Sequence, residues 1–214
     1  LHGGHVAPES DGFPEATLLP GQSTVFHYPN RQQAATLWYH DHALGITRLN
    51  IYMGLAGFYL LRGRAEHTLD LPRGDQEIPL LIQDRSFNPD GSLSYPEQWQ
   101  PEFLGTHILV NGKVSPYLEI GPGKYRFRLL NGSNTRTYVL VLDSGQPFYQ
   151  IGSDGGFLPE PVPLTALTLA PAERADVIID FSQRSGEVRL MNSALRPTDG
   201  IGVSEVLLFR VTGS

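Results

Sequence analysis

Histidine is scarce in this chain and unevenly distributed. Among its 214 residues there are 7 histidines, and residues 37–42 read LWYHDH, so that one residue separates His40 from His42. The chain opens with LHGGH, which places His2 beside a Gly-Gly pair. Imidazole nitrogens bind Zn, Cu, Fe and Ni. The two clusters predict a metal site, but the ligand type does not choose the metal, and a structural role for the His-x-His pair stays open.

The pair follows an apolar, aromatic run that is typical of a short β-strand. Successive side chains of a strand point to opposite faces, so His40 and His42 would project together beside Trp38, roughly 6.6 Å apart along the backbone. Two imidazoles at that spacing can serve one metal or two neighbouring metals. Asp41 would point the other way, and could either orient a ligand imidazole or form a turn.

The composition narrows the classes of function. Hydrophobic residues make up 40% of the chain, charged residues 18%, and the net charge is −6. These values favour a folded globular protein, and without a Lys/Arg cluster they argue against a nucleic-acid surface. No apolar run approaches the ~20 residues of a membrane helix. The chain has no cysteine, which excludes disulfides and thiolate ligands.

The arrangement of apolar runs favours an all-β chain. Short runs are separated by turn residues, with 23 glycines and 17 prolines in total. The segments 25–28, 36–40 and 55–61 are predicted to be strands, and 43–50 a short helix. A polar segment with little periodicity follows, and we interpret it as a linker. From residue 77 onward, about nine short strands predict a two-sheet β-sandwich.

Two stretches of the first part carry a family resemblance. LHGGHVAPESDGFPEA and HYPNRQQAATLWYHDHALGITRLNIYMGLAGFYLL resemble the first cupredoxin domain of multicopper oxidases, in the branch of bacterial spore-coat laccases and bilirubin oxidases. KYRFRLLNGSNTRTY and LAPAERADVIIDF look like the middle domain of that family. The resemblance implies tandem cupredoxin-like Greek-key β-sandwiches, the first one incomplete. Residues 1–62 would be the C-terminal part of the first domain, 63–76 the linker, and 77–214 the second domain, which carries no copper.

The resemblance also implies a set of ligands. In that family two His-x-His motifs of the first domain help to hold a three-copper cluster that reduces O₂ to water. The first motif is normally HLHGG, so His2 matches its second histidine, and His40 and His42 match the second motif. All three would be type 3 copper ligands, and a histidine preceding Leu1 would bind the type 2 copper.

Other residues receive weaker assignments. Asp11 resembles the family's proton-handling carboxylate near the cluster, although an aspartate before Gly12 also suits an ordinary turn. No motif position requires His5 as a ligand. Four arginines of the second half are expected to form salt bridges and interdomain contacts rather than to bind substrate: Arg126, Arg128, Arg136 and Arg174.

The parts that the chain lacks limit what it can do by itself. A type 1 copper site needs a cysteine thiolate, and the family's third domain supplies further cluster ligands. The chain begins with Leu, so we expect it to be a segment of a laccase-like oxidase that uses O₂ and a reducing substrate of phenol or pigment type, and to be inactive alone. A copper-free cupredoxin scaffold or interaction module remains the alternative. A hydrolytic zinc site is the third possibility.

Overall fold

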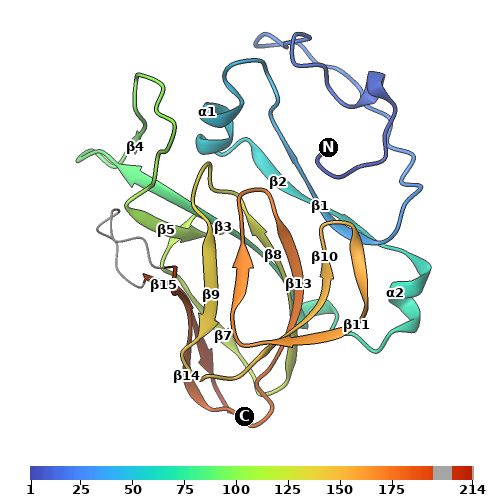
Figure 1. Cartoon of the computed structure of the whole chain (residues 1–214), viewed down its shortest axis with the longest axis vertical. Helices are drawn as coiled ribbons and strands as arrows, with labels where there is room; N and C mark the ends of the chain where they lie inside the picture. The colour runs from blue at the N-terminus through green and yellow to red at the C-terminus, as the bar shows by residue number, and fades with distance from the viewer. Residues whose placement is uncertain (195–203, 214) are drawn as a thin grey trace.

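Strands dominate the computed structural model, which describes residues 1–194 and 204–213 (Figure 1). The first part of the chain contains two strands and a few short helical segments. These are η1 (Pro8–Ser10), β1 (Ala35–His40), α1 (Thr47–Tyr52), β2 (Ala56–Leu61), α2 (Arg64–Thr68) and η2 (Gly74–Gln76). None of the helices among the described residues has the length and apolar character needed to cross a membrane.

The first part is a two-stranded sheet, preceded in the sequence by a long irregular loop. β1 and β2 pair antiparallel, with Trp38 opposite Phe58 and His40 opposite Ala56. Both strands confirm the sequence prediction. The strand predicted at 25–28 is wrong: those residues are irregular, and the Val25 side chain is 75% exposed. Apolar character alone does not make a strand where no neighbouring strand offers backbone partners.

The helix predicted at 43–50 begins later than expected, at Thr47. Gly45 has φ +79°, a left-handed conformation that a right-handed helix cannot include. The main-chain nitrogen of Ile46 donates to the carbonyl oxygen of Ala43, which closes a turn before the helix starts. The segment predicted as a linker, 63–76, contains α2 and η2.

The second part is a sandwich of two sheets, as the sequence predicted. The eight-stranded sheet has the order β11-β10-β13-β8-β3-β5-β6, with β4 paired to β3, and the five-stranded sheet has the order β12-β9-β14-β15-β7. The strands are β3 (Glu77–Phe87), β4 (Leu93–Ser94), β5 (His107–Val110), β6 (Lys113–Val114), β7 (Tyr117–Ile120), β8 (Lys124–Asn131), β9 (Tyr138–Leu142), β10 (Phe148–Ser153), β11 (Gly156–Leu164), β12 (Leu167–Leu169), β13 (Arg174–Asp180), β14 (Gly186–Asn192) and β15 (Ser204–Val211).

The core lies between these two sheets. Its side chains come largely from alternating strand positions, and several of them are aromatic. The members that are 0% exposed include Ile82, Phe127, Tyr138, Leu140, Phe148, Val177, Phe181, Val206 and Phe209. By contrast, the buried cluster of the first part contains only Ala35, Leu37 and Leu61. The β1–β2 pair is too small to form a core of its own and depends on the sandwich.

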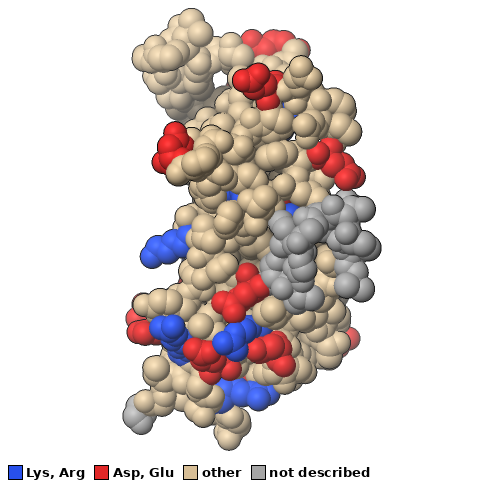
Figure 2. Space-filling model, turned by 90° about the vertical axis from the view of Figure 1, so that its left-hand side faces the viewer, with Lys and Arg blue, Asp and Glu red and all other residues tan. Residues whose placement is uncertain are grey.

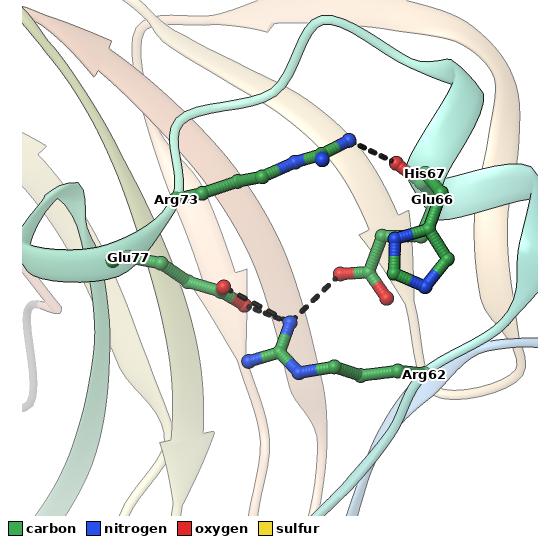
Figure 3. Close-up of a pocket in the computed structure, with 6 residues that line it drawn as sticks. Arg62, Glu66, His67, Arg73 and Glu77 are labelled. Atoms are coloured by element: carbon green, nitrogen blue, oxygen red, sulfur yellow. Dashed lines mark hydrogen bonds and ion pairs between the residues drawn. The ribbon is translucent and has the colours of Figure 1, made fainter.

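Buried charges join the two parts. The guanidinium groups of Arg126 and Arg128, on β8, lie 2.6 and 2.7 Å from the same carboxylate oxygen of Glu66 on α2. Arg126 also pairs with Asp176, and Arg128 with Glu77. Figure 3 shows Arg62 between the carboxylates of Glu66 and Glu77, at the open side of this cluster.

Two further arginine contacts fasten β1 itself. Arg128 donates to the hydroxyl oxygen of Thr36 at 3.1 Å, and Arg174 donates to the carbonyl oxygen of the same residue at 3.0 Å. The salt bridges and the contacts between the two parts that the sequence predicted are therefore present for Arg126, Arg128 and Arg174. Arg136 instead pairs with Asp84, 2.9 Å away, inside the sandwich.

Exposed charges are of both signs. Figure 2 shows basic side chains lying among acidic ones toward the lower end of the face that it presents. Arg189 forms ion pairs with Asp143, Glu187 and Glu205, and its side chain is 39% exposed. Such solvated pairs contribute little to stability.

The two kinds of arginine give a matched test. Replacing buried Arg126 by Met removes a positive charge that neutralises the carboxylates of Glu66 and Asp176. This loss should lower the free energy of unfolding by about 3–5 kcal/mol. The same replacement at exposed Arg189 should cost less than about 1 kcal/mol. Denaturant unfolding of both variants measures the difference, and equal losses would contradict the role assigned to the buried cluster.

Candidate metal centre

The candidate site lies at the end of β1, whose last residue is His40. The rings of Trp38 and His40 have centroids 4.3 Å apart, and the centroid of the His42 ring lies 5.9 Å from that of His40, with an angle of 29° between the two histidine planes. The two histidine rings therefore lie side by side, as their spacing predicted, although the strand does not extend to His42. His40 is partly buried, whereas His42 is exposed.

His2 joins these rings from the start of the chain. Its main-chain nitrogen donates to the carbonyl oxygen of Trp38 at 2.8 Å, which forms an isolated antiparallel bridge. Its ring centroid lies 5.1 Å from that of Trp38 and 5.5 Å from that of His40. The Nδ1 atom of His2 is 3.2 Å from Nε2 of His40. Two residues 38 positions apart in the sequence thus face each other directly.

The Gly-Gly turn after His2 passes over a side chain of the sandwich. Gly3 has φ +83°, and a Cβ atom there would lie 2.8 Å from Nη2 of Arg174 and 3.1 Å from Leu37. Arg174 is held in turn by the carbonyl oxygens of Thr36 and Ala172. Only glycine combines this backbone conformation with this close approach.

One tautomer of His40 follows from its neighbours. Nδ1 of His40 lies 2.7 Å from the main-chain carbonyl oxygen of Asp41, which can only accept, so Nδ1 carries the hydrogen. In the neutral ring, Nε2 then presents its lone pair toward His2. Asp41 therefore orients an imidazole through its main chain. Its carboxylate instead accepts hydrogen bonds from the main-chain nitrogen of Ala43 and from Asn50, as a turn-forming residue does.

The histidines open onto a cavity of about 450 Å³. The carboxylate of Asp11 belongs to its lining and lies 3.9 Å from the main-chain nitrogen of Leu1. The full lining is Leu1, His2, Gly3, Gly4, Asp11, Gly12, Pro14, His40 and His42. His5 is exposed and is not part of it. The four residues predicted for the site thus share one cavity.

Burial keeps two of the imidazoles neutral. It lowers the pKa of His2 to about 4, with the positive charge of Arg174 as the next cause. Burial also lowers the pKa of His40. A neutral imidazole is the form that binds a metal, because the ligand nitrogen must be free of its proton. Both rings are therefore ready to act as ligands at neutral pH.

The site is not a complete metal shell by itself. Among the residues that the structure describes, no three His, Cys, Asp or Glu side chains are placed to hold one metal ion together. His2, His40 and His42 can contribute to a shell that also takes ligands from elsewhere. Sequence reasoning did not identify Arg174 and Asn50 as neighbours of this site, since neither lies in a histidine motif.

Comparison with known proteins gives the family. The family model described as multicopper oxidase matches residues 1–66. The laccase of Bacillus stratosphericus is 52% identical over 217 residues, covering 91% of this chain and 42% of that protein. Multicopper oxidase LPR1 of Arabidopsis thaliana is 42% identical, covering 92% of this chain and 37% of that protein.

Solved structures of multicopper oxidases are also similar to this chain. A multi-copper oxidase from Pediococcus acidilactici matches with a TM-score of 0.89 at 35% identity, covering 99% of this chain and 44% of that one. The McoA multicopper oxidase of Aquifex aeolicus matches with a TM-score of 0.86 at 34% identity, covering 99% and 49%. The chain belongs to the multicopper oxidase family, with the cupredoxin-like all-β fold predicted from its sequence. It resembles laccases in particular, and it spans 42% of the length of the Bacillus relative.

Replacing Gly3 by Ala tests the close approach to Arg174. Gly45 has a similar positive φ, but a Cβ atom there would meet nothing within 4 Å, so Gly45→Ala carries the backbone strain alone. We expect Gly3→Ala to cost about 1–3 kcal/mol more than Gly45→Ala in unfolding free energy, because of the added overpacking. Denaturant unfolding measures both. Equal costs would mean that the turn over Arg174 is looser than described.

The pKa of His2 predicts how the metal-free protein responds to acid. In the unfolded chain an imidazole titrates near ~6.5, so between that value and about 4 the unfolded state binds more protons than the folded state. This contribution to stability is complete above pH ~6.5 and is lost as the pH falls toward 4. A ring titration by NMR should place His2 near the lower value, and His2→Gln should flatten the loss of stability. A His2 ring that titrates near its ordinary value would contradict the burial assigned to it.

Proposed function

We propose that this chain supplies part of the type 3 copper pair of a laccase-like multicopper oxidase, with His2, His40 and His42 as copper ligands. The observation that carries the proposal is the approach of His2 Nδ1 to His40 Nε2, 3.2 Å apart, at a cavity that His42 also lines. Copper bound there would supply the one-electron steps that together reduce O₂ to water.

The donor set suits copper. All three groups are imidazoles, which bind copper well, and burial keeps His2 and His40 unprotonated. The carbonyl oxygen of Asp41 holds the His40 ring with Nε2 as its free nitrogen. An outer partner of this kind fixes both the tautomer and the direction of a ligand ring. A copper-free scaffold would have no chemical use for such an arrangement.

Asp11 is the residue best placed to handle protons. Its side chain is 61% exposed and lines the cavity, so that it contacts both solvent and the site. A carboxylate in that position can take a proton from water and deliver it to the cavity, where O₂ reduction consumes protons. Asp11 also serves its turn, because its main-chain nitrogen donates to the carbonyl oxygen of Pro8. The two roles are compatible.

The activity is proposed for a longer polypeptide. The laccase and oxidase relatives are more than twice as long as the segment that they share with this chain. A third cupredoxin domain would complete the copper cluster and provide the type 1 copper, whose thiolate ligand this cysteine-free chain cannot supply. The reducing substrate would be of phenol or pigment type. The 214 residues alone are proposed to be inactive.

The test compares ligand and control variants of the full-length protein. His42→Ala should release copper and lower O₂ consumption with a phenolic substrate by more than the roughly 10–100-fold that loss of an outer partner costs. His107→Ala removes an exposed histidine of the sandwich and should change neither. Full copper content and turnover in His42→Ala would overturn the ligand assignment. Appreciable turnover by the isolated 214 residues with added copper would overturn the proposed inactivity.

A further inference from the structure

We propose that Asn50 is a positioning residue for the His40–His42 turn, and that it acts through the carboxylate of Asp41. This inference rests on the function proposed above, because it concerns how the same histidines are held. The side chain of Asn50 donates from Nδ2 to Oδ2 of Asp41 at 2.9 Å. Asp41 stands between the two histidines of the motif, so a displacement of Asp41 displaces both.

Asp41 is fixed by several hydrogen bonds besides that of Asn50. Its main-chain nitrogen donates to the carbonyl oxygen of Leu55, and its own carbonyl oxygen accepts from His40. The carboxylate oxygen that binds Asn50 also accepts from the main-chain nitrogen of Ala43 at 3.1 Å. Among the described residues, the bond from Asn50 is thus the one side-chain hydrogen bond that ties this carboxylate to another element.

Asn50 is itself held firmly at the backbone. Its main-chain nitrogen donates to the carbonyl oxygen of Ile46, and its carbonyl oxygen accepts from the main-chain nitrogen of Leu55. Thr47, at the start of α1, donates from its hydroxyl group to the carbonyl oxygen of Ala43. The helix and the turn therefore form one hydrogen-bonded unit with Asp41 and Asn50 near its centre.

The sandwich anchors α1 from the other side. The Tyr52 hydroxyl accepts from the main-chain nitrogen of Ser86 at 2.7 Å and donates to the carbonyl oxygen of Ser94 at 2.8 Å. The guanidinium of Arg85 lies 4.5 Å from the centre of the Tyr52 ring and donates to the carbonyl oxygen of Ile51. Asn134 donates to the carbonyl oxygen of Arg48. Because Asn50 belongs to α1 and binds Asp41, these contacts also hold the His40–His42 turn in place.

The position of His42 depends most on these hydrogen bonds from α1 through Asn50 to Asp41. His40 is oriented by Trp38, by His2 and by the carbonyl oxygen of Asp41. Among the described residues the His42 ring makes no hydrogen bond, and its centroid lies 5.9 Å from that of the His40 ring. Its direction is therefore set by the backbone of the turn. We expect loss of the Asn50 bond to disturb the copper held by His42 more than that held by His40.

The experiment uses the full-length, copper-loaded protein. Asn50→Leu removes the donor with little change in size and should weaken retention of the copper pair about 10-fold in a chelator competition, as loss of an outer partner typically does. It should also raise the electron paramagnetic resonance signal of uncoupled Cu(II). Asn50→Asp places a second carboxylate against Asp41 and should weaken retention further.

An exchange of the two residues gives the decisive control. Asp41→Asn combined with Asn50→Asp restores a donor and an acceptor, so it should recover retention relative to Asn50→Asp alone. Asn88→Ala removes an exposed turn contact with Ser92 and should leave copper unchanged. A merely structural role would lower the melting temperature without weakening copper retention and without raising the uncoupled signal.

The outcomes separate the two proposals. If the wild-type protein holds copper and Asn50→Leu holds it as tightly as Asn88→Ala does, only the positioning role of Asn50 is overturned. If Asn50→Asp fails to fold, the comparison of Asn50→Leu with the exchange variant decides the same question. If the wild-type protein retains no copper at these histidines, the proposed function and this inference both fail.

Discussion

The main-chain hydrogen bond from His2 to the carbonyl oxygen of Trp38 is the constraint on which the candidate site depends. It brings the start of the chain against β1, and the register of that bridge places the His2 ring between Trp38 and His40. The residues between the two partners form a long loop with little regular structure. The bridge leaves Nδ1 of His2 3.2 Å from Nε2 of His40, and the side chain of Gln32 supports the same turn through hydrogen bonds with Gly3 and His5.

The sandwich provides the support that the β1–β2 pair cannot supply alone. Arg128 and Arg174 both bind Thr36, one through its hydroxyl group and the other through its carbonyl oxygen. Arg174 also lies beneath the Gly3 turn, and its charge helps to keep His2 neutral. A part of the molecule to which we assign no copper therefore fixes the backbone that carries the proposed ligands. Through Arg174 it also disfavours the protonated form of His2, which would not bind a metal.

Local patterns in the sequence were enough to predict much of the fold and to select the histidines as candidate ligands. The alternation and turn residues predicted β1, β2 and most of the sandwich, but not β7, β11 or the two-residue strands β4 and β6. β11 contains three prolines, which are typical of a non-strand and are tolerated here because β11 lies at a sheet edge. The motif spacing selected His40 and His42 as candidate metal ligands, whereas the family resemblance supplied the choice of copper. Arg174 and Asn50 could not be found in this way. Arg174 meets Thr36 across 138 positions, and the bond of Asn50 depends on where α1 begins.

A crystal structure of the full-length protein, grown with copper and measured at the copper absorption edge, tests the central claim most directly. We predict anomalous peaks in the cavity beside Asp11, each about 2 Å from imidazole nitrogens, a distance typical of metal–imidazole bonds. His40 should bind through Nε2, with Nδ1 still on the carbonyl oxygen of Asp41. A copper-loaded protein with no peak there, or with the rings of His2, His40 and His42 directed away from the metal, would contradict it.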